Sequence, residues 1–322
     1  MLNELTMDDR SRDPAVIAES VTARDRWDRL LAQVSLPHFT QSWCYGEGKR
    51  SQGWAVERLQ FAYAGEAVAI CQVLVKRVLG LPVAARINRG PLFLGEASPE
   101  VQLTVLQALR QRWRYGRRGL LLMAPSLPFD AASTSLLRAA GFTSRKPGGW
   151  GSALIDLHPS LDAIRAGLSS KWRNHLNGSL KAGIAVRVSG EREVFDWMLE
   201  QHAGNMAIKG YVGPSVSFVR NMIASSPQDF SVYQAYIDNQ PVSAILLARF
   251  GTHAETYLSW TGEAGRRSNA HHLLLWQLIV ESKANGCRAI DLGGYTTSGK
   301  YGAYKRGMKG REYRLTGEWI AF

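Results

Sequence analysis

Residues 266–310 constrain the fold more than any other stretch of this chain, because they place a helix, a short strand and a glycine pair in a fixed order. Ser268 or Asn269 can cap the helix, and an Asn-Gly pair ending at Gly286 can close it. A strand over 288–292 then runs directly into two glycines. Ligands in open α/β sheets bind at the carboxyl ends of strands. This order therefore predicts an α/β fold with a site at that edge of a sheet.

The residues around this strand end have different expected roles. We expect Asp291 to orient the turn by accepting backbone N–H bonds, while Gly293 and Gly294 supply permissive backbone. A loop over 300–307, rich in lysine and tyrosine, brings cations to the same edge. Lys305 in this loop can stabilise a negative charge that develops in acyl transfer, or hold a phosphate. The alternative is a lysine that is only solvated.

A second candidate is the start of the same helix, where Arg266, Arg267, Ser268 and Asn269 follow one another. Free backbone N–H groups at a helix start, preceded by two arginines, form an anion site. Ordinary capping with solvated arginines is the alternative, and the sequence weighs the two evenly.

The charge of the chain narrows its partners. Its 322 residues carry a net charge of +12 with an isoelectric point near 9.8, which favours nucleic acid, phosphorylated metabolites or anionic lipid headgroups. A generically basic protein is the alternative. The three cysteines are far apart in the sequence and show no metal-ligand spacing, so we expect no metal and a reducing, cytoplasmic location. We expect neither a signal peptide nor a transmembrane segment, but a peripheral contact with the inner membrane surface stays open.

The two halves of the chain show similar patterns. Loop-forming residues at 144–149 mark a boundary between a first domain over 20–150 and a second over 151–322. Apolar strands pair across a polar turn at 60–75 and again at 234–249, which hints at an internal duplication. The remaining predicted elements are strands at 83–88, 120–124, 151–157, 184–188 and 256–260, and helices at 25–31, 99–115, 131–140, 162–182 and 191–206.

Several common site motifs do not occur in the sequence. It holds no phosphate-binding loop of the GxxxxGK[ST] type and no GxGxxG between a strand and a helix. It also lacks HExxH and GxSxG, which argues against a zinc protease or a serine hydrolase of the elbow type.

A combination of motifs resembles the FemABX-type proteins, the peptidoglycan-bridge aminoacyltransferases and their relatives among the GNAT-fold acyltransferases. The motifs are Gln41-Ser42-Trp43, Lys49, Gly53-Trp54, Ser169-Ser170-Lys171-Trp172-Arg173, Trp260-Thr261-Gly262, Ser268-Asn269-Ala270-His271-His272, Asp291-Leu292-Gly293-Gly294 and Tyr304-Lys305-Arg306-Gly307. They span nearly the whole chain.

The resemblance implies two tandem GNAT-like domains with mixed central sheets and a cleft between them. The family's catalytically important aromatic–lysine pair falls on Tyr304 and Lys305, and a lysine that contacts a pyrophosphate falls on Lys49. Trp43 and the junction at 266–269 are further candidates for substrate contact. The implied reaction forms an amide on an amine of a cell-envelope or polysaccharide precursor, without a tightly bound cofactor.

The chain also departs from the family pattern. The coiled-coil insertion that some members use for tRNA contact is absent. The basic and aromatic positions of the second domain are met only loosely, by Lys209, Tyr211 and Phe218. Aminoacyl-tRNA and acyl-CoA therefore both remain candidate donors, and a pyrophosphate-linked precursor remains a candidate acceptor. A second hypothesis is a non-catalytic basic module that binds nucleic acid or anionic glycolipid on a degenerate GNAT scaffold, with no dependence on Lys305.

Overall fold

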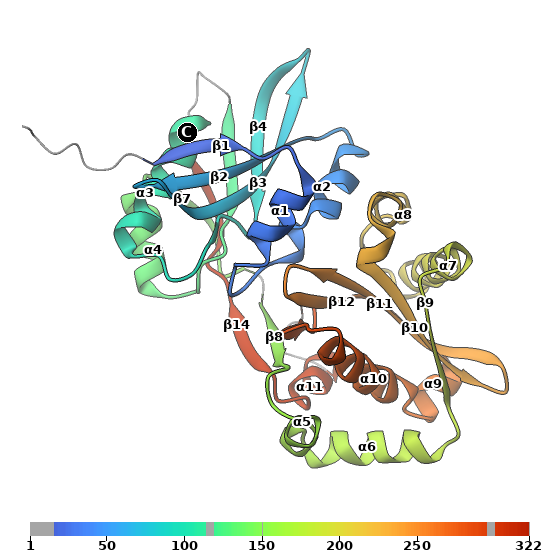
Figure 1. Ribbon diagram of the computed structural model, residues 1–322. Helices are drawn as coiled ribbons and strands as arrows, with labels where there is room; N and C mark the ends of the chain where they lie inside the picture. The colour runs from blue at the N-terminus through green and yellow to red at the C-terminus, as the bar shows by residue number, and fades with distance from the viewer. Residues whose placement is uncertain (1–15, 114–118, 150, 295–299, 322) are drawn as a thin grey trace, which may run out of the picture.

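The computed structural model describes residues 16–113, 119–149, 151–294 and 300–321. The chain folds around two mixed sheets with helices packed beside them (Figure 1). The elements of the first half are β1 (Ile17–Ser20), α1 (Arg24–Leu31), η1 (Phe39–Gln41), α2 (Trp43–Arg50), β2 (Ala55–Tyr63), β3 (Glu66–Val78), β4 (Leu81–Asn88), β5 (Leu92–Phe93), α3 (Pro99–Arg112), β6 (Leu120–Ala124), α4 (Ala131–Ala139) and β7 (Thr143–Pro147). The predicted α/β class is confirmed.

The second half has a similar sequence of elements. They are β8 (Gly151–Asp156), α5 (Leu161–Gly167), α6 (Ser170–Lys181), β9 (Ala185–Ser189), α7 (Arg192–Lys209), α8 (Val216–Ser225), η2 (Pro227–Asp229), β10 (Phe230–Ile237), β11 (Gln240–Phe250), β12 (His253–Thr261), α9 (Glu263–Arg267), α10 (Ala270–Ala284), β13 (Ala289–Asp291), α11 (Lys300–Arg306), β14 (Arg311–Arg314) and β15 (Gly317–Ala321). None of the described helices is long and apolar enough to cross a membrane.

The two sheets repeat one topology. The first has the order β1-β2-β3-β4-β6-β15-β7 with β5 beside β3, and the second has β14-β8-β13-β12-β11-β10-β9. In each sheet a hairpin leads to an antiparallel strand, and a helix then crosses to a parallel neighbour. The parallel pairs are β4 with β6, across α3, and β12 with β13, across α10. This repeated order agrees with the duplication that the two hairpins suggest.

A shared hydrophobic core joins the halves. Buried side chains of α1 and η1, such as Trp27 and Phe39, belong to the same cluster as Phe218 on α8 and Phe230 on β10. The helices α2 and α8 pack closely at this junction. A Cβ added at Gly48 would lie 2.4 Å from Met222 Cγ, so glycine is what allows this approach.

Several expectations differ from the structure. The loop expected at 144–149 includes most of the strand β7. The helix predicted over 162–182 is two helices, because Leu168 is extended and the Ser169 side chain accepts the Trp172 N–H to start α6. The predicted loop at 300–307 contains the short helix α11. Residues 317–321, which the expected second domain includes, form β15, and this strand pairs with β6 and β7 in the first sheet.

Candidate functional site

The Lys305 side chain is buried at the carboxyl end of β13. Its ammonium group donates to the backbone carbonyl of Leu292, to that of Gly293 at 2.9 Å, and to that of Gly294 at 3.5 Å. Burial lowers the pKa of Lys305 to about 8, although the nearby Asp291 and Glu255 carboxylates act in the opposite direction. A partly desolvated ammonium group is thus held at the end of a strand. Its electric field on a bound substrate is screened less there than at the protein surface.

Asp291 holds this strand end in shape. Its carboxylate accepts the Ser152 hydroxyl, the Gly293 N–H at 2.8 Å and the Tyr313 hydroxyl at 2.5 Å. The positive φ of Gly293, 72°, turns its carbonyl toward Lys305. Asp291 and the glycines therefore shape the strand end that holds the Lys305 ammonium group.

A pocket of about 790 Å³, called here the second pocket, opens beside this strand end. Residues from α7, β12, α9, α10, α11 and the segments between them line it: His202, Asn205, Lys209, Tyr211, Pro214, Tyr257, Leu258, Ser259, Thr261, Gly265, Arg266, Asn269, His271, His272, Gly294 and Tyr304. Lys209 and Arg266 are cations, and these lining residues include no carboxylate. The pocket therefore suits an anionic or neutral ligand.

The histidines behind Tyr304 are neutral. Burial lowers the pKa of His271 to about 4 and that of His272 to about 3, with nearby cationic or titratable groups acting in the same direction. Tyr304 packs edge-on against His272, with ring centroids 4.9 Å apart, and lies 6.4 Å from the Trp172 ring. The aromatic member of the predicted pair is thus fixed by packing at the pocket wall.

The predicted anion site at the start of α10 is only partly met. Neither Ser268 nor Asn269 caps α10 with its side chain, because the Ser268 hydroxyl donates to Ala264 and Asn269 adopts φ 56°. Both arginines lie in α9: Arg266 reaches the Thr261 carbonyl at the pocket, whereas Arg267 pairs with Glu263 in solvent.

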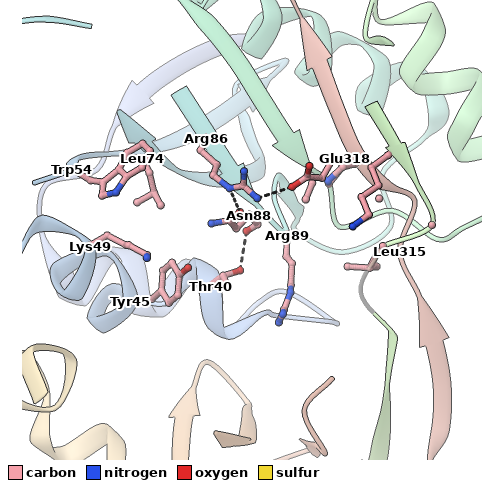
Figure 2. A pocket seen from close by; sticks show the side chains of 16 residues that line it. Thr40, Tyr45, Lys49, Trp54, Leu74, Arg86, Asn88, Arg89, Leu315 and Glu318 are labelled. Atoms are coloured by element: carbon pink, nitrogen blue, oxygen red, sulfur yellow. Dashed lines mark hydrogen bonds and ion pairs between the residues drawn. The ribbon is translucent and has the colours of Figure 1, made fainter. Parts of the chain in front are cut away.

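A second hollow, of about 720 Å³, lies in the first half and is called here the first pocket. Thr40, Tyr45, Lys49, Trp54, Leu74, Arg86, Asn88, Arg89, Ala124, Pro125, Lys146, Gly148, Gly149, Leu315, Gly317 and Glu318 line it. Figure 2 shows Lys49, Tyr45 and Trp54 on one side and Arg86, Arg89 and Glu318 on the other. Four cations face one carboxylate, and Arg86 is paired with that carboxylate at 2.8 Å.

Lys49 and Trp43 have different positions. Lys49 lies over the Phe218 ring of α8, with its ammonium 4.4 Å from the centroid, and burial lowers its pKa. The Trp43 ring lies under the buried Arg58 guanidinium at 3.5 Å, and it lines neither pocket. Lys49 and Tyr304 thus lie in different pockets rather than in one.

A buried ion pair joins the two regions. Arg89 follows β4 and lines the first pocket, and its guanidinium lies 3.9 Å from the carboxylate of Glu255 on β12. Glu255 is the register partner of Asp291, so the pair ends beside the Lys305 site. Burial raises the pKa of Glu255, and the negative charge of the nearby Asp291 acts in the same direction to a smaller extent. Sequence reasoning missed Arg86, Arg89 and Glu255, and the only signal was the Arg-Gly-Pro turn at 89–91.

Both pockets occupy equivalent places in the repeated topology. The first lies at the carboxyl ends of β4 and β6, through Asn88 and Ala124. The second lies at the carboxyl ends of β12 and β13, through Thr261 and Gly294. Each fits the rule that open sheets bind ligands beyond the carboxyl ends of parallel strands.

Comparisons with known proteins agree with this architecture. Residues 168–306 match the family model of an acetyltransferase (GNAT) domain. The fold is similar to the crystal structure of FemX, with a TM-score of 0.79 and 16% identity over 94% of this chain and 96% of that one. No curated protein matches the chain.

Two further structures are similar at lower scores. One is the C-terminal domain of a putative lysylphosphatidylglycerol synthetase from Agrobacterium fabrum, with a TM-score of 0.58 and 14% identity over 92% of this chain and 91% of that one. The other is a tandem GNAT protein from the clavulanic acid biosynthesis pathway, with a TM-score of 0.52 and 14% identity over 95% and 98%. The protein is thus of the tandem GNAT fold, and the domain match supports an acyltransferase. Within that fold its architecture is similar to that of FemX.

Proposed function

We propose that this chain transfers an acyl or aminoacyl group to an amine of a cell-envelope or polysaccharide precursor. The second pocket receives the donor, either aminoacyl-tRNA or acyl-CoA, and the first pocket receives the anionic acceptor. The observation that carries the proposal is the buried Lys305 ammonium, which lies beside Gly294 and Tyr304 at the edge of a pocket whose described lining has no carboxylate.

The proposed chemistry is direct transfer. The acceptor nitrogen attacks the donor carbonyl carbon, an amide bond forms, and the bond from that carbon to the leaving oxygen or sulfur breaks. The proton lost by the nitrogen ends on the leaving atom. Lys305 stabilises the oxyanion by exchanging its 3.5 Å bond to the Gly294 carbonyl for a bond to the substrate oxygen. Tyr304 shapes the donor pocket, and no covalent enzyme intermediate is required.

The cations of the two pockets have separate roles in this proposal. Lys209 and Arg266, with Tyr211, neutralise and contact the donor phosphates in the second pocket. Lys49 binds the phosphates of the acceptor in the first pocket. One similar solved structure is the C-terminal domain of a putative lysylphosphatidylglycerol synthetase. The name of that protein joins lysine to an anionic lipid, which supports an anionic acceptor here.

Lys305→Ala is the decisive variant. We expect it to lower turnover by at least about 100-fold, the order of effect of removing one oxyanion donor. Lys283 offers a matched control, because its ammonium also donates to backbone carbonyls, those of Leu157 and His158, outside both pockets. Lys283→Ala should keep turnover within about twofold.

The measurement is product formation followed by mass spectrometry. Charged tRNAs and acyl-CoAs are offered as donors against UDP-linked muropeptides and amino sugars as acceptors, with circular dichroism to check folding. Product from acyl-CoA alone would assign the thioester donor. Near-normal rates for a folded Lys305→Ala variant on the true substrate pair would contradict the proposal.

A further inference from the structure

The turn between β3 and β4 has an unusual residue for its conformation. Val78 and Leu81 form the last pair of the hairpin, so the turn consists of Leu79 and Gly80. Their φ values are 50° and 80°. Two-residue turns with both φ values positive favour Asn-Gly, and an L residue other than Asn, Asp or Gly is strained there. Leucine therefore destabilises the turn that it occupies.

The same leucine is fully exposed. Leu79 is 98% exposed, Leu81 69%, Val78 53% and Val83 43%. We call residues 78–83 the hairpin tip. In Figure 1 the hairpin stands out from the body of the first half. A strained backbone and a solvated leucine side chain both make leucine unfavourable at this position in the isolated protein. A partner that covers the Leu79 side chain would offset this cost.

The base of the tip is cationic and held in place. Arg77 donates to the Gly80 carbonyl at 3.1 Å and lies 3.7 Å from the Glu57 carboxylate. Lys76 donates to the Gly53 carbonyl at 3.4 Å. Apolar side chains at the end of a fixed hairpin, with two cations directly behind them, are complementary to an anionic bilayer surface.

We infer that the hairpin tip inserts into the surface of an anionic lipid bilayer. Leu79 and Leu81 enter the boundary between headgroups and acyl chains, and Lys76 and Arg77 contact the lipid phosphates. The net charge of +12 draws the protein toward such a surface.

The same two strands line the first pocket. Leu74 on β3 and Arg86 on β4 are register partners, and both line it. Leu74 precedes Val78 by four residues, about 13 Å along a strand. Insertion of the tip therefore places the first pocket close to the phosphates of the lipid. The proposed function assigns the first pocket to the acceptor. If that assignment holds, the acceptor is an anionic, lipid-linked amine.

The test is sedimentation of the full chain with vesicles of phosphatidylcholine containing phosphatidylglycerol, and with vesicles of phosphatidylcholine alone. We expect binding to the anionic vesicles, weakened by salt, and at least about tenfold less for Leu79→Asn. The same variant should melt at an unchanged or higher temperature, because asparagine suits the turn. Leu180→Asn makes the same change at an exposed leucine of α6, which lies at the opposite end of the molecule in Figure 1, and should bind like the parent chain.

Three outcomes would overturn the inference. The first is parent-chain binding that is absent, or that Leu79→Asn leaves unchanged. The second is a dimer in analytical ultracentrifugation that Leu79→Asn dissociates, since a second copy would then cover the tip. The third is loss of turnover by Leu79→Asn on a soluble, lipid-free acceptor, which would make the tip part of the pocket. Vesicle binding needs no turnover, so a failure of the proposed reaction stays distinguishable from a failure of this inference.

Discussion

Each half of the molecule has a pocket at the equivalent position of its sheet, but different side chains line the two pockets. In the first half, the ends of β4 and β6 carry Asn88 and Ala124, and four cations and one carboxylate line the pocket around them. In the second, the end of β13 carries a buried aspartate that shapes two glycines around a buried lysine. The fold supplies the location twice, and the side chains distinguish the two pockets. In the proposed function the first pocket binds charge, and the second also stabilises charge during the transfer.

The largest expected effect is a loss of stability, and it compares the polar end of β13 with the apolar end of β6. Asp291→Ala removes the acceptor for Ser152, Gly293 and Tyr313, and should lower the free energy of unfolding by about 3 kcal/mol or more. Met123→Ala, at the buried end of β6, should cost about 2–5 kcal/mol through lost packing. Chemical denaturation measures both. Turnover should fall only in Asp291→Ala, because Lys305 loses its support there; an equal fall in both would remove the distinction between the ends.

The next effect concerns pH. Burial lowers the pKa of Lys305 to about 8, so its ammonium form is present below pH 8 and is lost as the pH rises through that value. If the charged form acts, kcat should decline above about pH 8. Glu255 raises the pKa of Lys305, so Glu255→Gln should move the decline to lower pH.

Several other groups bear on this titration. Asp291 also raises the pKa of Lys305, His271 is neutral through burial, and Arg89 faces Glu255 from the first half. Glu263→Gln removes the same charge from the surface and serves as the control. The profile is best measured with a weakly basic acceptor amine, whose own titration lies below the range. If kcat declines at the same pH in Glu255→Gln as in the parent chain, Glu255 does not influence the titration of Lys305.

A smaller effect should distinguish the ligands of the two pockets. Arg86→Gln removes a cation of the first pocket and should raise the KM of the acceptor about tenfold with kcat unchanged, as expected for a lost charge-assisted hydrogen bond. Lys209→Gln should raise the KM of the donor instead. Initial rates with each substrate varied in turn give both constants. Exchange of the two effects would reverse the assignment of donor and acceptor.

Local patterns in the sequence predicted most of the elements, and long-range pairing explains what they missed. The hairpins and the helix from Pro99 follow from alternation and capping within a few residues. The place of β15 depends on pairing with β6, about two hundred residues away, which no local pattern encodes. The break at Ser169 was missed because the apolar stripe continues through it, although the serine caps a new helix.

The site divides in the same way. The strand end at Asp291 and its glycines are local, and the residues themselves indicate a site there. The Tyr304–Lys305 pair rests on the family resemblance, since a lysine in a basic chain is usually solvated. Arg86 and Asn88 share one face of β4, but which face meets the pocket depends on the register with β3 and β6. Glu255 meets Arg89 only through the packing of the two halves.

The smallest expected effect tests the junction at 266–269, where two adjacent arginines looked equivalent. Arg267 is 70% exposed and pairs with Glu263 in solvent, and exposed pairs of this kind contribute about 0–1 kcal/mol. Arg267→Ala should therefore leave turnover and stability nearly unchanged. Arg266 lines the second pocket, so Arg266→Ala should raise the KM of the donor severalfold. Donor titrations at low and moderate salt compare them. An equal dependence on both arginines would mean that the donor spreads over the solvent face of α9, beyond the second pocket.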